Sequence, residues 1–409
     1  MLSTYAARSH PEPATLSTPT PPPNPPPAPR VPSATGVPDR AARRAVTAVF
    51  LANGMAVSSF IARIPDVQTS LGLGEAVLGL VLPGVSIGVI TGLTISGRVI
   101  PRSGSRRLLL TGATITAVLL PLAGLAPAAW LLAATLVVLG AGSSMMDVGM
   151  NAQGVGIERG FGRSIIVGMH AAWSVGTLIG ALGGTLATAT ATSVPVHLSL
   201  VAVAFGALTA VAARWLRVAD HAEPGAPARF AIARGPLLPL ALVAFAAALG
   251  EGAAANWSGI HLRDTVEVSA GRVGWGYVAY TAAMVSVRLV GDRLTARFGR
   301  RRVVTGGGLL AACGFGLVAG VPVLPLALLG FAMVGLGLGS TVPLAFAAGG
   351  RVARTPGEGV AAIASVAYLA FLVGPPVVGY LAEHVSLAAG FALVAVVVAG
   401  LTARRLPVD

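Results

Sequence analysis

Long apolar runs separated by short polar gaps fill the chain from residue 44 to residue 403. Twelve such runs lie near 44–63, 76–97, 108–126, 130–153, 165–187, 194–214, 236–258, 273–291, 303–321, 324–348, 360–380 and 387–403. A helix needs about 20 mostly apolar residues to cross the hydrocarbon core of a bilayer, and the runs are close to that length. The pattern therefore predicts an all-α membrane protein with twelve transmembrane helices.

The polar gaps differ in arginine content, and this difference predicts the orientation of the chain. Arginines cluster before the first run, after every even-numbered run and at the end of the chain. The opposite set of gaps holds only Arg63, Arg263 and Arg272. Because cytoplasmic loops of membrane proteins carry an excess of basic residues, both termini are expected on the cytoplasmic side.

The composition agrees with a membrane location and indicates which molecules the charged residues contact. The chain is 55% hydrophobic and 11% charged, whereas soluble proteins carry about 25% charged residues. The formal net charge of +13 comes from arginines between apolar runs, where membrane lipid headgroups rather than nucleic acid are the expected partners. One cysteine, Cys313, and scattered histidines offer neither an intrachain disulfide nor a metal site. No phosphate-binding G-x-x-x-x-G-K-[ST] loop is present, so we expect no direct coupling to ATP. We also expect no enzyme activity and no cofactor.

Two polar stretches divide the chain into four parts. Residues 1–39 are proline-rich and lack an apolar core, which is typical of a disordered cytoplasmic tail. The longest polar gap between runs, 215–235, is predicted to be a cytoplasmic linker. It separates an N-terminal six-helix bundle, 40–214, from a C-terminal six-helix bundle, 236–405.

Short segments of the first bundle recur in the second. GRVIPRSGSRR (97–107) is echoed by GDRLTARFGRR (291–301), each after the second helix of its half. WSVGTLIGALGG (173–184) is echoed by FLVGPPVVGYLA (371–382), each in a fifth helix. Repeats at an offset of nearly half the chain predict two pseudo-symmetric bundles related by an axis along the membrane normal.

This layout resembles the major facilitator superfamily over roughly 40–405. The basic turns resemble its G-x-x-x-D-R-x-G-R-R signature, although Pro101 and Ala296 stand at the acidic positions. MDVGMNAQ (146–153) is similar to the fourth helix of the fucose–proton symporter branch, and other segments resemble a related uncharacterised bacterial inner-membrane group. The resemblance implies a monomeric secondary transporter of the bacterial inner membrane that works by alternating access.

An acid lies deep within the fourth run. Asp147 is about 16 Å from Glu158 at 1.5 Å per residue, and insertion of an acid at such a depth costs about 2.5–3.5 kcal/mol. Asn151 follows four residues later, so the two side chains share a helix face. Since burial favours the neutral acid, Asp147 is predicted to carry the coupling proton. A permanent structural pairing with neighbouring polar side chains is the alternative.

A second acid, Glu251, lies in the middle of the seventh run. Gly250 and Gly252 flank it and weaken the helix locally. Glu251 is predicted to assist in proton coupling, the alternative being a buried acid paired with an amide. Asn256 and Trp257 follow and are predicted to contact a solute, which requires the segment to bend because neither shares a helix face with Glu251.

Three further residues are predicted to bind solute. Trp173 lies at the depth of Asp147, so its ring is placed to pack on the C–H face of a sugar while Asp147 and Asn151 bind the hydroxyls. His170 and Asn53 are predicted as polar contacts. Helix packing is the alternative for Trp173 and His170, and a bond between helices is the alternative for Asn53.

These features predict proton-coupled symport of a small polar, sugar-like solute. The first alternative is a proton-coupled efflux antiporter of drugs or metabolites. Exporters of that kind carry G-x-x-x-G-P-x-x-G-G in helix five. In this chain the corresponding segment begins at Gly176, and the residue directly after Gly180 is not proline. The second alternative is a membrane sensor that binds solute without moving it. Sodium in place of protons also stays open as the coupling ion.

Overall fold

The computed structural model describes residues 39–158, 160–161, 165–217, 233–353 and 355–403. Contacts divide the chain into residues 1–36 and 37–409, and every described element belongs to the second unit. The predicted tail, apart from its last residue, lies outside the described residues, as do positions 218–232 of the predicted linker.

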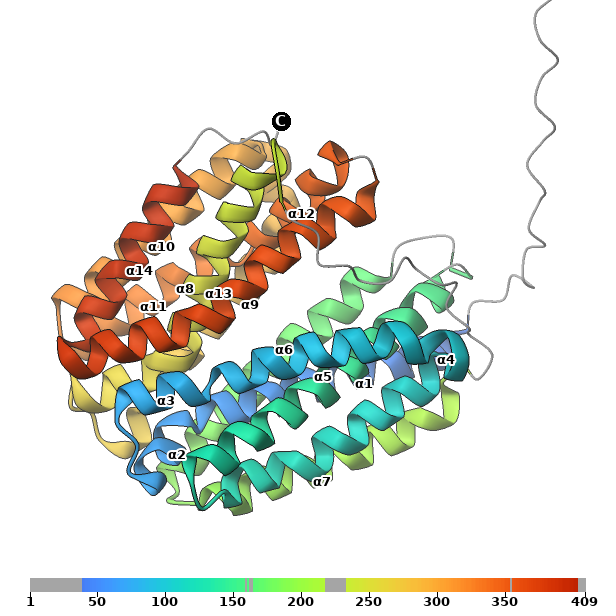
Figure 1. Cartoon of the computed structure of the whole chain (residues 1–409), viewed down its shortest axis with the longest axis horizontal. Helices are drawn as coiled ribbons and strands as arrows, with labels where there is room; N and C mark the ends of the chain where they lie inside the picture. The colour runs from blue at the N-terminus through green and yellow to red at the C-terminus, as the bar shows by residue number, and fades with distance from the viewer. Residues whose placement is uncertain (1–38, 159, 162–164, 218–232, 354, 404–409) are drawn as a thin grey trace, which may run out of the picture. The chain divides into compact units, whose positions relative to one another are not determined.

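Every regular element in the described residues is a helix, which confirms the predicted all-α fold class (Figure 1). The first half comprises α1 (Arg40–Ala62), α2 (Ile64–Leu71), α3 (Glu75–Val81), α4 (Pro83–Leu125), α5 (Ala129–Glu158), α6 (Ile166–Ala189), α7 (Val194–Ala212) and the short 3-10 helix η1 (Ala213–Trp215). The second half comprises α8 (Leu237–Asp264), η2 (Ala270–Arg272), α9 (Trp275–Phe298), α10 (Arg300–Gly320), α11 (Leu324–Leu338), α12 (Thr341–Val352), α13 (Pro356–His384) and α14 (Leu387–Thr402).

The predicted second and third spans lie in α4, in which two helices meet at a glycine. The 43 residues of α4 correspond to about 65 Å of helix, roughly twice the hydrocarbon thickness of a membrane, which suffices for two crossings. Gly104 breaks it with φ 77° and ψ 163°, a conformation that is essentially restricted to glycine. Gly299 adopts nearly the same angles, φ 78° and ψ 152°, between α9 and α10. The two glycines lie in the repeated basic segments, so the sequence repeat is also a repeat of backbone geometry.

Ten helical segments in the described residues are long and apolar enough to cross a membrane. One of them, Glu75–Leu125, is the pair of spans divided at Gly104, and another, Leu324–Val352, combines α11 and α12. The 16-residue helix α14 is a shorter apolar helix. Together these segments account for the twelve predicted spans, arranged as two halves of six.

Small residues allow the helices of each half to approach closely. A side-chain carbon placed on Gly176 of α6 would lie only 2.1 Å from the carbonyl oxygen of Leu51 in α1. One on Gly88 of α4 would lie 2.0 Å from the carbonyl oxygen of Val137 in α5. Close backbone approach through glycine is a common way of packing membrane helices, because lipid supplies no hydrophobic force between them.

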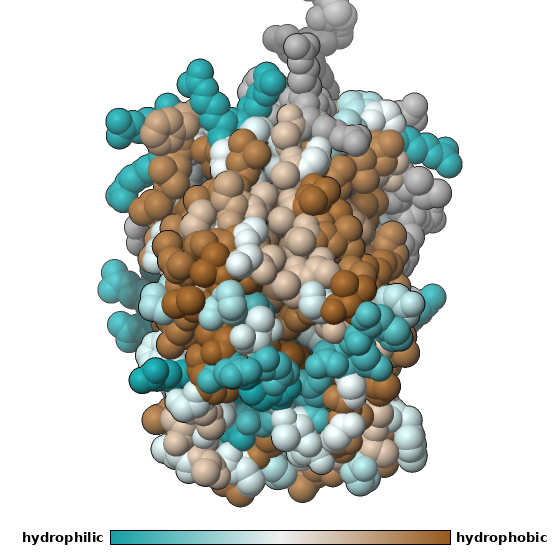
Figure 2. All heavy atoms as spheres, turned by 90° about the vertical axis from the view of Figure 1, so that its left-hand side faces the viewer, coloured by the Kyte–Doolittle hydropathy of each residue, from teal (hydrophilic) through white to brown (hydrophobic). Residues whose placement is uncertain are grey.

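The arginines define two ends of the helices. Successive spans run in opposite directions, so arginines of alternate gaps lie together at what we term the Arg-rich end. It carries Arg40, Arg43, Arg44, Arg98, Arg102, Arg106, Arg107, Arg214, Arg217, Arg234, Arg293, Arg297, Arg300, Arg301, Arg302 and Arg351. The Arg-poor end carries Arg63, Arg263 and Arg272. Figure 2 shows an apolar belt between two polar bands on one face of the protein, as expected for a protein that spans a bilayer.

The two halves meet at the Arg-poor end. Figure 1 shows them converging where α3 approaches the C-terminal end of α13 and diverging toward α12. The hydrogen bonds between halves that the described residues form all lie at this end. They join Ser58 to Tyr277, Arg263 to Pro65, Gln68 and Thr69, and Ala76 to Glu383.

Candidate functional site

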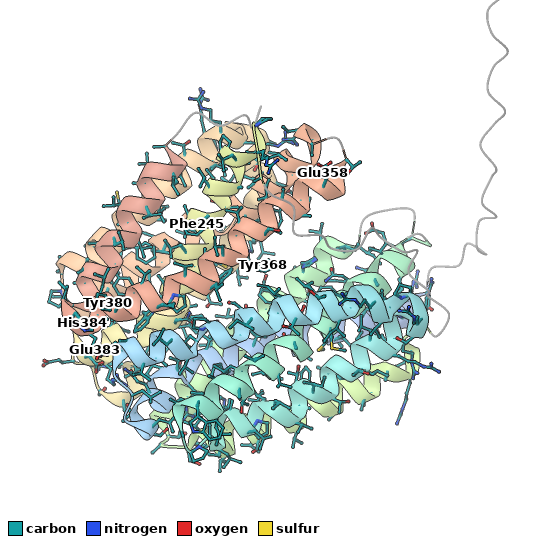
Figure 3. All side chains as sticks on the ribbon, in the orientation of Figure 1. Phe245, Glu358, Tyr368, Tyr380, Glu383 and His384 are labelled. Atoms are coloured by element: carbon teal, nitrogen blue, oxygen red, sulfur yellow. The ribbon has the colours of Figure 1, made fainter. Side chains whose placement is uncertain are left out.

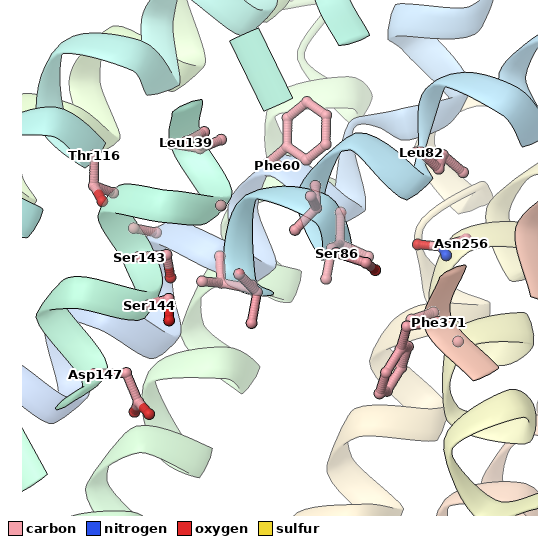
Figure 4. Close-up of a pocket in the computed structure, with 18 of the residues that line it drawn as sticks. Phe60, Leu82, Ser86, Thr116, Leu139, Ser143, Ser144, Asp147, Asn256 and Phe371 are labelled. Atoms are coloured by element: carbon pink, nitrogen blue, oxygen red, sulfur yellow. The ribbon is translucent and has the colours of Figure 1, made fainter. Parts of the chain in front are cut away.

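A cavity of about 380 Å³ lies between the two halves (Figure 4). Its walls come from α1, α4, α5 and α6 on one side and from α8 and α13 on the other. The polar and aromatic side chains that line it are Asn53, Phe60, Ser86, Thr116, Ser143, Ser144, Asp147, Trp173, Asn256, Tyr368 and Phe371. Pockets that bind small ligands measure about 300–1,000 Å³, so this cavity has the size for one small solute.

Asp147 is the one charged residue in the cavity lining. Its side chain is exposed rather than sealed by packing. In the described part of the chain it forms no ion pair, because the ion pairs there join Arg63 to Asp66 and Arg263 to Asp264. The geometry therefore gives Asp147 access to solvent in the cavity and leaves its charge without a permanent cation.

The helix face of Asp147 is polar for more than two turns. Asn151 donates to the Asp147 carboxylate Oδ1 at 3.2 Å and to its backbone oxygen at 2.9 Å, which confirms that the two side chains point the same way. Ser143 lies one turn before Asp147 and also lines the cavity. Asn151 is not part of the lining, so its amide orients the carboxylate from one side in this conformation.

Asn53 and Trp173 form a bonded pair across α1 and α6. The Trp173 indole Nε1 donates to Asn53 Oδ1 at 3.0 Å, and Asn53 Nδ2 lies 3.4 Å from Met146 Sδ. Asn53 is only 3% exposed. Both residues line the cavity, but the amide of Asn53 is occupied by the bond between helices. Asn53 therefore fixes the orientation of the Trp173 ring, which corresponds to the alternative given for it above.

The wall from the C-terminal half is built around Phe371. Phe371 and Tyr368 come from α13, and Asn256 comes from α8. Figure 4 shows Asn256 and Phe371 across the cavity from Asp147, and Figure 3 shows Tyr368 on the side of α13 that faces the N-terminal half. A side-chain carbon on Gly252 would lie 3.2 Å from the Phe371 ring, so the ring packs on α8 where the glycine leaves room for it.

Besides Asn151, three of the predicted site residues lie outside the cavity lining. Trp257 is fully buried and packs near Gly379 of α13, so it does not reach the cavity in this conformation. His170 is exposed on α6, with its ring edge-on to Phe50 at 5.1 Å. Glu251 has one carboxylate oxygen, Oε1, that is buried without a hydrogen-bond partner in the described residues.

The positive charge of Arg288, on α9, acts electrostatically on Glu251. The same charge acts on His170, and Arg288 Nε donates to the backbone oxygen of Gly339 at 3.1 Å. Gly339 lies at the break between α11 and α12. The sequence placed Arg288 within the eighth span but carried no signal that it would act on an acid in the seventh.

Two charged side chains hold the Arg-poor end closed, and we term their contacts the latch. Arg263, at the end of α8, donates to the Pro65 backbone oxygen, Gln68 Oε1 and Thr69 Oγ1, each at 2.8 Å. Glu383, near the end of α13, accepts from the backbone N–H of Ala76 at 2.7 Å (Figure 3). The latch joins α8 to α2 and α13 to the first turn of α3, so it connects the two halves at the Arg-poor end.

Metal ligation does not explain the acids. Within the described residues, no group of three or more His, Cys, Asp or Glu side chains is placed to hold a metal ion. The arrangement combines a small cavity, one accessible acid and walls from both halves.

Comparison with known proteins agrees with the repeat and the helical fold. Residues 46–241 and 240–408 each match the family model described as Major Facilitator Superfamily. An uncharacterized transporter of Sinorhizobium fredii is 33% identical over 368 residues, covering 89% of this chain and 97% of that protein. An uncharacterized MFS-type transporter of Yersinia pestis is 30% identical over 347 residues, covering 85% of this chain and 90% of that protein.

Solved structures share the fold at low sequence identity. A bacterial homolog of the human lysosomal transporter Spinster, in an inward-facing and occupied conformation, has a TM-score of 0.71 at 13% identity, covering 88% of this chain and 94% of that chain. The nucleoside transporter NupG has a TM-score of 0.68 at 13% identity, covering 88% of this chain and 97% of that chain. At such identities the likeness concerns the arrangement of helices and not the transported solute.

Proposed function

The chain belongs to the major facilitator superfamily and is a multi-pass membrane transporter, and we propose that it couples the uptake of a small polar, sugar-like solute to protons through Asp147. The observation that supports this most is the single accessible acid in a cavity shared by both halves. An intramembrane acid that faces such a cavity marks a proton or substrate pathway by default.

With the predicted orientation of the chain, the structure corresponds to a state of the transport cycle that opens toward the cytoplasm. With the Arg-rich end in the cytoplasm, the latch lies on the outer side and the halves diverge toward the cytoplasm. Rocking of the halves about the cavity then gives alternating access. Symport requires Asp147 to bind its proton more tightly when solute is present, a coupling free energy of about 1–3 kcal/mol.

Glu251 has a secondary part in this proposal. Its carboxylate is partly enclosed in α8 and lies under the influence of Arg288, so a change in its surroundings requires movement of the C-terminal half. We propose that Glu251 responds to that movement, while Asp147 exchanges protons with the cavity directly.

Flux measurements on the full chain in proteoliposomes test the proposal. An inward proton gradient is expected to drive accumulation of a labelled monosaccharide or polyol from a panel of such solutes. Export driven by the same gradient would indicate the efflux alternative, and binding without flux would indicate a sensor. Dependence on a sodium gradient instead of a proton gradient would contradict the assignment of the coupling ion.

Replacement of the acid tests the residue itself. Asp147→Asn is expected to reduce gradient-driven accumulation to background while exchange of solute across the membrane continues, because the amide binds hydroxyls but carries no transferable proton. Asp292→Asn is the matched control, since Asp292 is exposed on α9 and does not line the cavity. Normal accumulation by the Asp147→Asn variant would remove Asp147 from the coupling mechanism.

A further inference from the structure

The two walls of the cavity differ in chemistry. The N-terminal half supplies the acid and most of the hydroxyl groups, including Ser143, Ser144 and Thr116. The C-terminal half supplies Tyr368, Phe371 and Asn256. Figure 4 shows Thr116, Ser143, Ser144 and Asp147 on one side of the cavity and Asn256 and Phe371 on the other, with Ser86 between them. A solute held between these walls meets hydrogen-bonding groups on one face and an aromatic ring on the other.

We propose that Phe371 is the platform on which the solute stacks, and that the cavity therefore selects ring-shaped hydroxylated solutes over open-chain ones. A pyranose presents C–H groups on one face of its ring and hydroxyl groups around its edge. Its apolar face packs on an aromatic ring, and its hydroxyls bind to polar side chains. An open-chain polyol with the same hydroxyl groups has no such face. This inference rests on the proposed function and adds the class of solute and the residue that selects it.

The bonding of Trp173 favours Phe371 over that ring as the platform. The Trp173 ring is tied to Asn53 through its indole N–H at 3.0 Å and lies on the same half as Asp147. A solute that stacked on Trp173 would have its apolar face on the wall that also carries Asp147. Phe371 faces Asp147 from the opposite half, so a solute between them contacts both halves, as alternating access requires.

The wall from the N-terminal half contains a hydroxyl group without a hydrogen-bond partner in the described residues. Ser144 Oγ has no hydrogen-bond partner in the described residues, although it is buried at the cavity. Thr116, in contrast, donates to the backbone oxygen of Gly112 at 3.0 Å. A buried hydroxyl without a partner is costly, and a solute hydroxyl offers the partner that Ser144 lacks.

Packing behind Phe371 supports a specific position for its ring. A side-chain carbon on Gly252 would lie 3.2 Å from Phe371 Cδ1 and 3.5 Å from Cε1, so α8 supports the back of the ring. An alanine at position 252 would displace the Phe371 ring by a few tenths of an ångström. Gly252→Ala is therefore a second, milder way to disturb the platform.

Uptake of matched ring and chain solutes tests the inference. The probes are D-glucose with D-glucitol, D-galactose with galactitol and L-fucose with L-fucitol, each measured under an inward proton gradient in proteoliposomes. The wild-type chain is expected to prefer the ring member of at least one pair. Phe371→Leu is expected to lower kcat/KM for that ring solute about tenfold and to change the chain solute less than twofold. Gly252→Ala is expected to act in the same direction with a smaller change.

The control and the outcomes separate this inference from the proposed function. Phe245→Leu is the matched control, because Phe245 lies on α8 but does not line the cavity, and it should leave the ring preference unchanged. Equal loss for ring and chain solutes in Phe371→Leu, or no ring preference in the wild type, would overturn the inference while solute uptake itself stands. Absence of uptake for all six solutes would overturn the proposed function and this inference with it.

Discussion

Removal of the Arg263 side chain should open the Arg-poor end of the transporter. Arg263 contributes three hydrogen bonds across the halves, to Pro65, Gln68 and Thr69, each 2.8 Å long. Each is worth about 0.5–1.5 kcal/mol net. The side chain is 27% exposed, and solvent screening moves the sum toward its lower end, about 1.5–2 kcal/mol. At 1.4 kcal/mol per factor of ten, Arg263→Ala should shift the ratio of closed to open conformers at this end at least about tenfold.

Distances between spin labels measure this shift. Ser70 on α2 and Ser269 after α8 are exposed and belong to opposite halves, so labelled cysteines at these positions report the width of the Arg-poor end. The single native cysteine, Cys313, is exposed and is first replaced by serine. Pulsed electron paramagnetic resonance in nanodiscs is expected to show one main short distance in the parent. In Arg263→Ala a longer distance should gain population.

The control for this experiment is another arginine at the same end. Arg272 is exposed and forms no hydrogen bond to the other half in the described structure, so Arg272→Ala removes the same charge without breaking the latch. Its distance distribution should match that of the parent. An unchanged distribution in Arg263→Ala, or an equal change in both variants, would refute the assignment of Arg263 as the residue that holds this end closed.

Two further substitutions test other parts of the structure. Glu383→Ala should also increase the population of the longer spin-label distance, but by less than Arg263→Ala. It removes one hydrogen bond, from the Ala76 N–H at 2.7 Å, rather than three. A larger increase than in Arg263→Ala would contradict this ranking. Gly104→Ala should lower the melting temperature in detergent, because an L-residue at φ 77° and ψ 163° costs about 1–3 kcal/mol. Gly97→Ala, where added atoms meet open space on the same helix, should leave the melting temperature unchanged, and equal stability of the two variants would exclude backbone strain at Gly104.

The spans and the helix face of Asp147 could be predicted from the sequence because both depend on local spacing. Run length sets the number of crossings, and an offset of four residues places Asn151 beside Asp147 on any regular helix. The same reasoning shows why Asn256 and Trp257 did not both reach the cavity. Adjacent residues point about 100° apart on a helix, so the one that lines the cavity, Asn256, leaves the other buried.

The rest of the site depends on contacts between segments far apart in the chain. Phe371 and Tyr368 are aromatic residues within an apolar run, and the sequence gives no signal that one aromatic residue faces a cavity while another faces lipid. Asn53 could be identified as polar and buried, but its bond to Trp173 follows from the pairing of α1 with α6. The latch has the same origin, because Arg263 meets α2 across about 195 residues of chain.

The two intramembrane acids differ in what can reach them, and this difference bears on coupling. Asp147 is exposed at the cavity, and the latch joins the two halves at the Arg-poor end. Under the proposed function, Asp147 would in this state exchange protons toward the Arg-rich end. Glu251 has a carboxylate oxygen buried without a hydrogen-bond partner and lies near Arg288, so its surroundings change only when α8 and α9 move. The coupled transport proposed above needs an acid that is reached from one side at a time, and among the described residues of the cavity lining Asp147 is the one acid.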